Sequence, residues 1–199
     1  MTLPHLQGTS LYLIGMMGSG KTTIGTLLAD RLGYQFFDTD TLIETITQQS
    51  ISQLFAESGE AIFRQLETQV LSELSSYGRK LISTGGGIVV TPENWGHLRT
   101  GVIVWLDVPV AVLCDRLAQD NTRPILQGDV DLTDKLNSLL ETRSSLYAQA
   151  DLRIQIQADE TPEMICDRIL SALTQACQAK AEENAQTLRL NQEKPFQTY

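Results

Sequence analysis

The stretch GMMGSGKT at residues 15 to 22 contains the residue types that bind nucleotide phosphates. The phosphate-loop pattern is glycine, four arbitrary residues, glycine, lysine and then serine or threonine, and its fixed places are filled by Gly15, Gly20, Lys21 and Thr22. Backbone N–H groups can surround a phosphate only where no Cβ blocks the approach, which the glycines of this stretch permit. Lys21 would bring a positive charge to the β- and γ-phosphates, and Thr22 would place a hydroxyl on Mg²⁺.

The segments on either side of this stretch agree with a phosphate loop. Residues 11 to 15, LYLIG, form an apolar run suited to a buried parallel strand. Residues 21 to 33 have helical apolar spacing and end at Gly33, as a helix with a C-cap glycine would. The alternative, a chance glycine-rich turn, does not account for a strand and a helix on the correct sides.

Two carboxylates follow the second expected strand, in the sequence YQFFDTD at residues 34 to 40. The two-residue period of a strand would aim Asp38 and Asp40 to one side, at the strand end where ligands of parallel sheets gather. One carboxylate could hold Mg²⁺ through water, and the other could orient an acceptor hydroxyl toward the γ-phosphate. Helix N-capping is an equally good explanation of these aspartates.

Three consecutive glycines, Gly85, Gly86 and Gly87, come at the end of another expected strand at residues 80 to 87. They suggest a place where a ligand approaches the backbone closely, and a flexible turn is the alternative.

Three arginines stand in positions that suit anion binding. Arg64 lies three residues before Glu67 on an apolar helix, a spacing at which the carboxylate can hold the guanidinium. Arg123 lies in a polar loop, as a lid arginine would, and Arg143 lies on the helix that follows. An ordinary surface position is the alternative for each of them.

Strands and helices alternate along the chain, which predicts an α/β fold with a mostly parallel sheet covered on both faces. Further strands are expected at residues 101–108 and 151–158, and further helices at 50–74, 91–100, 109–119, 132–150 and 161–179. A Ser50–Gln53 capping box begins the first of these helices, and Ser58–Gly59 interrupts it. Thr91 and Thr161 are each followed by proline, and we expect them to be the N-caps of the helices at 91–100 and 161–179.

Length and composition favour one domain over residues 1–180, followed by a frayed helix extension and a disordered tail over 181–199. The formal net charge of −9 argues against a nucleic-acid partner. No signal peptide and no apolar run long enough to span a bilayer is visible, so we expect a cytoplasmic protein without a membrane partner.

Cysteine and histidine give little material for other chemistry. Cys114, Cys166 and Cys177 are odd in number and widely spaced, so neither a disulfide framework nor a zinc site is supported. His5 and His97 are the only histidines, which argues against a histidine-based triad or metal cluster.

Six segments together resemble shikimate kinase: GMMGSGKTTIG, FFDTD, AIFRQLE, STGGGIV, NTRPIL and ETRSSLY, in this order and at similar spacings over roughly residues 9 to 175. The resemblance implies a nucleoside monophosphate kinase-like three-layer fold with the phosphate-loop strand central in a five-stranded parallel sheet, and a lid loop. It also implies transfer of the γ-phosphate of MgATP to the 3-hydroxyl of shikimate. Separately, we expect the protein to be a monomer.

The resemblance assigns roles to matching positions. It implies ATP-binding roles for Gly18, Ser19, Gly20, Lys21, Thr22, Thr23, Arg116 and Arg123, with Lys21, Asp40 and Arg123 as catalytic residues. It implies that Thr22 and, through water, Asp38 hold Mg²⁺. Shikimate would be bound by Asp40, Arg64, Gly85, Gly86, Gly87 and Arg143, with Ile51, Phe55 and Phe63 as walls of its pocket.

Two other functions remain to be weighed. A gluconate kinase of the same fold would share the phosphate loop and the lid, but it gives no reason for Arg64 and Arg143 together with the three glycines. A regulatory protein that has kept the fold without turnover would not need Lys21 and Asp40. A comparison of acceptors in an activity assay would distinguish these functions.

Overall fold

A computed structural model describes residue 6, residues 8–118 and residues 131–192 of the chain. Side chains are described as far as residue 182. The expected lid loop, including Arg123, and the last seven residues lie outside the described residues.

The fold is built on one parallel sheet of five strands in the order β2-β3-β1-β4-β5. Its strands are β1 (Leu11–Ile14), β2 (Gln35–Asp38), β3 (Lys80–Ser83), β4 (Val102–Asp107) and β5 (Leu152–Gln155). Strand β1 is central, with Leu11 in register with Leu81 on one side and with Val102 on the other. The α/β class, the parallel sheet and the central phosphate-loop strand are therefore as predicted.

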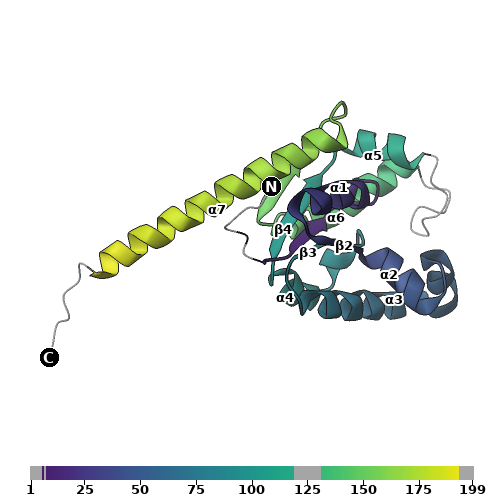
Figure 1. The fold of residues 1–199 in the computed structure, drawn as a ribbon. Coiled ribbons are helices and arrows are strands. Elements are labelled where there is room, and N and C mark those ends of the chain that lie inside the picture. Colours follow the sequence, from purple (N-terminus) through teal and green to yellow (C-terminus); the bar gives the residue numbers. More distant parts are fainter. Residues whose placement is uncertain (1–5, 7, 119–130, 193–199) are drawn as a thin grey trace.

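Helices cover the sheet on both faces (Figure 1). They are α1 (Lys21–Leu32), α2 (Thr39–Thr47), α3 (Ile51–Ser75), the 3₁₀ helix η1 (Ile88–Val90), α4 (Asn94–Leu98), α5 (Val110–Leu117), α6 (Leu132–Tyr147) and α7 (Pro162–Gln192). Helix α1 packs against α7, while α2 packs against α3. The pair α2 and α3 lies toward one end of the sheet in Figure 1, and the far end of α7 projects beyond the body.

The apolar runs read from the sequence become the core. All four residues of β1 are completely buried, as a central strand covered on both faces requires. The chain therefore emerges from the core directly into the phosphate loop, which starts at Gly15.

Several local predictions hold in detail. Gly33 ends α1 in the left-handed conformation, and its N–H bonds to the carbonyl of Asp30. Ser50 and Gln53 form the reciprocal capping box of α3. Gly59 breaks α3 with φ 79° and ψ 169°, where the sequence predicted an interruption. The three cysteines form no disulfide.

Two helix boundaries differ from the prediction. Helix α4 begins at Asn94 rather than after Thr91, because the carbonyls of Thr91 and Pro92 accept bonds from residues three positions ahead and close a separate turn. Helix α7 continues to Gln192, so the helix extension expected after residue 179 is present and is longer than a frayed end. Residues 180–192 contain no glycine or proline and are rich in helix formers, which explains the longer helix.

No helix among the described residues is both long enough and apolar enough to cross a membrane.

Candidate functional site

The turn between β1 and α1 has the backbone conformation that a phosphate loop needs. Gly15, Gly18 and Gly20 have φ values of 144°, 74° and 88°, a region that side chains with a Cβ rarely adopt. A Cβ on Gly15 would also lie 2.6 Å from the carbonyl oxygen of Leu106 on β4. Because Gly20 offers no side-chain cap to α1, the first N–H groups of that helix remain able to bind an anion.

Lys21 is held inside this loop. Its ammonium donates hydrogen bonds to the carbonyl oxygens of Gly15 at 3.0 Å and Met16 at 2.9 Å, and to the hydroxyl of Ser19 at 3.3 Å. The residue is only 8% exposed, so its charge lies within the loop rather than in solvent. This places a cation where the terminal phosphates of a nucleotide would be expected.

A cavity of about 910 Å³ runs along the phosphate loop. Of the predicted site residues, it is lined by Gly18, Gly20, Lys21, Thr22, Thr23, Asp38, Asp40, Gly86 and Arg116. The guanidinium of Arg116 on α5 reaches back to the loop and donates to the carbonyl of Gly18 at 3.2 Å. One cavity therefore gathers most of the residues predicted to bind the nucleotide.

Asp38 both caps a helix and faces the phosphate loop. Its Oδ1 accepts bonds from the N–H groups of Asp40 and Thr41 at 3.1 and 3.3 Å, which caps α2. Its Oδ2 accepts the hydroxyl proton of Thr22 at 2.7 Å. The two interpretations of this aspartate, as a cap and as a site residue, therefore hold together. A hydroxyl and a carboxylate side by side are oxygen ligands of the kind that Mg²⁺ prefers.

Asp40 lies in the first turn of α2 and not on the strand, so the argument from strand alternation was wrong for it. The strand ends at Asp38 because the cap bonds bend the chain into the helix there. Asp40 nevertheless lines the large cavity and also a second, smaller one. This carboxylate therefore stands where the two cavities meet.

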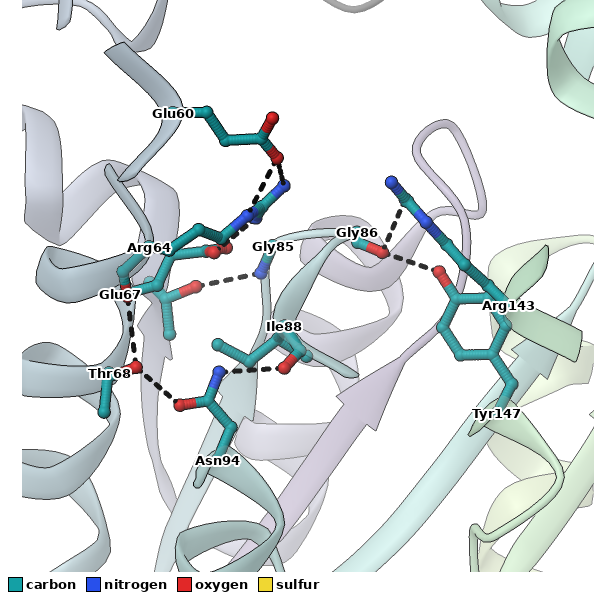
Figure 2. Close-up of polar contacts among 11 residues, drawn as sticks. Glu60, Arg64, Glu67, Thr68, Gly85, Gly86, Ile88, Asn94, Arg143 and Tyr147 are labelled. Carbon is teal, nitrogen blue, oxygen red and sulfur yellow. Dashed lines mark hydrogen bonds and ion pairs between the residues drawn. The ribbon is translucent and has the colours of Figure 1, made fainter. Parts of the chain in front are cut away.

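The second cavity encloses about 50 Å³. Its lining includes every residue that the sequence assigned to the acceptor substrate: Ile51, Phe55, Phe63, Asp40, Arg64, Gly85, Gly86, Gly87 and Arg143. Figure 2 shows Arg64 and Arg143 on opposite sides of the glycine loop, the first from α3 and the second from α6. Two cations, Arg64 and Arg143, and two carboxylates, Asp40 and Glu67, thus converge on a pocket with apolar walls.

Arg64 is held by two carboxylates. Its Nη1 donates to Glu67, as the spacing predicted, and its Nη2 lies 2.9 Å from the carboxylate of Glu60. The side chain of Glu67 is 1% exposed, so the alternative of a solvated surface pair is wrong for it. Burial lowers the pKa of Arg64, but the charges of Glu67 and Glu60 outweigh this and leave that pKa raised. Glu60 was not singled out from the sequence, although its position four residues before Arg64 is a known pairing distance.

Glu67 is a buried carboxyl with an unusual proton affinity. Burial raises its pKa from 4.5 to about 7, Arg64 opposes the rise, and the negative charge of Asp40 adds to it. Within the described part of the chain, its Oε1 makes no hydrogen bond. A Cβ on Gly85 would come within 2.5 Å of that oxygen and within 2.7 Å of Asp40 Oδ1, so any larger residue here would have to displace these carboxylates.

The carbonyl of Gly86 is an anchor for α6. It accepts a bond from Nη1 of Arg143 at 3.2 Å and another from the hydroxyl of Tyr147 at 2.6 Å (Figure 2). Tyr147 is completely buried, its ring stacks on Trp105, and burial raises its pKa to about 12. Sequence reasoning missed Tyr147, although its position four residues after Arg143 places both on one face of a helix.

Sequence reasoning also missed part of the large cavity. Glu160, Pro162 and Ile165 line it, at the segment that follows β5 and begins α7. The general rule that ligands collect at the carboxyl ends of parallel strands applies to β5 as it does to β2, and could have found them. Thr161 was identified only as the N-cap, and its hydroxyl does accept a bond from the N–H of Met164.

Sequence comparison finds close relatives over most of the chain. A family model described as shikimate kinase matches residues 17–174. A shikimate kinase of Nostoc sp. strain PCC 7120 is 57% identical over 168 residues, which cover 84% of this chain and 92% of that protein. A shikimate kinase of Thermosynechococcus vestitus is 54% identical over 169 residues, covering 85% of this chain and 92% of that protein.

Comparison of structures agrees with this similarity. Shikimate kinase from Acinetobacter baumannii in complex with shikimate has a TM-score of 0.81 at 35% identity, covering 85% of this chain and 95% of that one. A gluconokinase from Sinorhizobium meliloti covers 88% of this chain and 97% of its own with a TM-score of 0.53, but it is 14% identical and is similar in fold alone.

Proposed function

Because the chain belongs to the shikimate kinase family, it transfers the γ-phosphoryl group of ATP to the 3-hydroxyl of shikimate, and we propose that the two cavities meeting at Asp40 are its substrate sites. The products are ADP and shikimate 3-phosphate. The position of Asp40 in the lining of both cavities is the observation that carries the assignment, because phosphoryl transfer requires the acceptor hydroxyl to point at the γ-phosphate.

The large cavity is the proposed ATP site. The phosphate-loop N–H groups and Lys21 bind the β- and γ-phosphates, with Gly18, Ser19, Gly20, Thr22 and Thr23 forming the surrounding loop and helix start. Arg116 borders the same cavity and lies against the adenine in this proposal. Arg123, outside the described residues, is proposed from the family resemblance to reach the phosphates from the lid.

Thr22 and Asp38 are the proposed Mg²⁺ residues. Their oxygens lie 2.7 Å apart at the cavity wall, and a hydroxyl next to a carboxylate fits a hard divalent cation that keeps most of its waters. Thr22 would ligate the ion directly and Asp38 through water. When bound, Mg²⁺ would neutralise charge on the β- and γ-phosphates.

The small cavity is the proposed shikimate site. Shikimate carries one carboxylate and three hydroxyls, so it calls for cations at one end and hydrogen-bond acceptors at the other. Arg64 and Arg143 supply the cations, and a planar guanidinium can hold a carboxylate by two parallel bonds. The backbone of Gly85, Gly86 and Gly87 contacts the ring substituents between them.

In this proposal, Asp40 activates the hydroxyl of shikimate that accepts the phosphoryl group. Its carboxylate accepts a hydrogen bond from the 3-hydroxyl, orients that oxygen for in-line attack, and receives the proton as the bond to phosphorus forms. Lys21 and the loop N–H groups stabilise the charge that shifts onto the β-phosphate as the bridging bond breaks.

We further propose a cytoplasmic monomer formed by a domain of residues 1–180, acting without nucleic-acid or membrane partners. The net charge of −9 disfavours binding to nucleic acids or anionic lipid surfaces.

An assay of ADP release with MgATP tests the proposal, comparing shikimate with gluconate, AMP and no acceptor. We expect release only with shikimate. Release with gluconate would favour the other small-metabolite kinases and would overturn the assignment of Arg64 and Arg143 to the shikimate carboxylate. ATP binding without turnover on any acceptor would favour a regulatory protein.

A further inference from the structure

Glu60 occupies one edge of the Arg64 guanidinium. One oxygen of Glu60 accepts bonds from both Nε, at 3.2 Å, and Nη2, at 2.9 Å. Figure 2 shows this carboxylate on the far side of Arg64 from Glu67. The Nε–Nη2 edge is one of the two edges through which a guanidinium can hold a carboxylate by two bonds.

The other edge of Arg64 is already closed by the protein. Nη1 donates to Glu67, and a Cβ on Gly87 would lie within 2.8 Å of Nη1, Nη2 and Cζ. The Gly87 backbone therefore covers the edge between the two terminal nitrogens. A ligand carboxylate that is to form two bonds with Arg64 must take the edge that Glu60 holds.

The two glutamates differ in how easily they can leave. The side chain of Glu67 is 1% exposed, whereas that of Glu60 is 63% exposed and can return to water at little cost. Glu60 also follows Gly59, where the helical backbone is broken and a Cβ would meet nothing within 4 Å. Of the two partners, Glu60 is the one that can be exchanged.

The small cavity lies against Arg64. Its volume of about 50 Å³ is enough for one or two waters, since a water in the liquid takes up about 30 Å³. Arg64 lines this cavity and Glu60 does not, so Glu60 acts on the cavity through its bonds to Arg64.

We propose that Glu60 is a specificity-determining residue: a resident carboxylate that keeps Arg64 neutralised and oriented, and that only an anionic ligand can replace. This inference rests on the proposed role of Arg64 in binding the shikimate carboxylate. When the shikimate carboxylate replaces Glu60, one ion pair with Arg64 is exchanged for another. The net free energy gained on binding is therefore smaller than it would be if Glu60 were absent. A neutral ligand gains nothing from displacing Glu60 and is rejected.

Shikimate binding to the Glu60→Gln variant tests this inference by calorimetry and steady-state kinetics. Because an exposed helical ion pair is removed as a competitor, the Kd and KM for shikimate are expected to fall about two- to fivefold. The KM for ATP and kcat should stay unchanged, a pattern that a change in folding would not give.

Glu57→Gln is the matched control. Glu57 is exposed on the same helix and accepts a hydrogen bond from Gln49 at 2.7 Å, so its replacement makes the same change in charge without a contact to Arg64. Its shikimate Kd should equal that of the unmodified protein. An equal gain in both variants would reduce the effect to net charge and overturn the inference.

The uncharged amide of shikimic acid provides the second comparison. It should bind weakly to the unmodified protein and gain at least as much as shikimate from Glu60→Gln, because it cannot form an ion pair that offsets the displacement of Glu60. A Kd for shikimate that is unchanged or increased in Glu60→Gln would overturn the inference.

The Arg64→Lys variant distinguishes a wrong inference about Glu60 from a wrong assignment of Arg64 to the shikimate site. If Arg64→Lys weakens shikimate binding while Glu60→Gln does not strengthen it, Arg64 holds the substrate and the inference about Glu60 is wrong. If Arg64→Lys leaves the Kd unchanged, the proposed role of Arg64 is itself wrong.

Discussion

The hydroxyl of Tyr147 donates a hydrogen bond to the carbonyl oxygen of Gly86 at 2.6 Å, and this bond ties α6 to the loop between the two cavities. Gly86 is also tightly packed against the phosphate loop, since a Cβ on it would lie 3.2 Å from the backbone nitrogen of Met17. Arg143 reaches the same carbonyl from one turn earlier on α6. One peptide group therefore touches the proposed ATP site on one side and a proposed shikimate-binding arginine on the other.

Tyr147→Phe removes this bond while keeping the ring on Trp105. We expect a loss of about 1 kcal/mol in the free energy of unfolding, the usual net value of a hydrogen bond. Because the Gly86 carbonyl then has only Arg143 to hold it, the KM for shikimate should rise more than kcat falls. Urea denaturation and initial rates measure both effects. An unchanged KM would limit Tyr147 to a role in stability.

Asp40→Asn keeps the size of the side chain but removes its charge and its ability to take a proton. We expect kcat to fall by about 10² to 10⁴, the usual range for loss of a general base, with ATP binding nearly intact. Single-turnover rates and nucleotide titration separate the two quantities. Full activity would remove Asp40 from the proposed chemistry.

Arg143→Lys keeps the charge but loses the planar fork that can hold a carboxylate by two bonds. The KM for shikimate should rise on the order of tenfold, as expected when a charge-assisted bond is lost. The KM for ATP should change little. Equal changes in both Michaelis constants would point to a general disturbance of α6 instead.

Gly85→Ala should damage the shikimate site by steric conflict. The new methyl group would meet Glu67 and Asp40 at 2.5 and 2.7 Å, and overpacking of this kind costs about 1 to 3 kcal/mol. We expect lower thermal stability and a lower kcat/KM for shikimate. Gly96→Ala on α4 is the control, because a Cβ there meets nothing within 4 Å. Similar behaviour of the two variants would contradict the close packing of this loop.

Glu67 should make stability depend on pH. Its pKa is about 7 in the folded protein and 4.5 ordinarily, so between these values the folded protein binds more protons than the unfolded chain. The contribution of Glu67 is then fully present below pH 4.5 and is lost as the pH rises through 7. Urea denaturation should show a smaller decline from pH 5 to 8 in Glu67→Gln. Parallel declines in both proteins would assign the pH dependence to other groups.

Local patterns in the sequence were sufficient to predict the elements that position the site. The phosphate loop, the capping box at Ser50 and Gln53, and the break at Gly59 depend on neighbouring residues only, and each appears in the structure as predicted. The apolar strands and the helices between them also sufficed to predict the parallel sheet. The predicted start of α4 was wrong because the carbonyls of Thr91 and Pro92 close a separate turn. The side chain of Asn94, where the helix begins, also accepts a bond from Thr68, 26 residues away, which neighbouring residues alone do not report.

The sequence by itself therefore determined the fold class, the phosphate loop and the residue types of the site, because their signals lie within short stretches of chain. Only the tertiary structure decided how those residues combine. It placed Asp40 in a helix between two cavities, gave Arg64 a buried and an exposed partner, and brought Tyr147 to Gly86 across 61 residues. The physical reason is burial, which excludes water from Glu67 and Tyr147 and leaves Glu60 in solvent. No local sequence pattern reports how deeply a side chain will be buried.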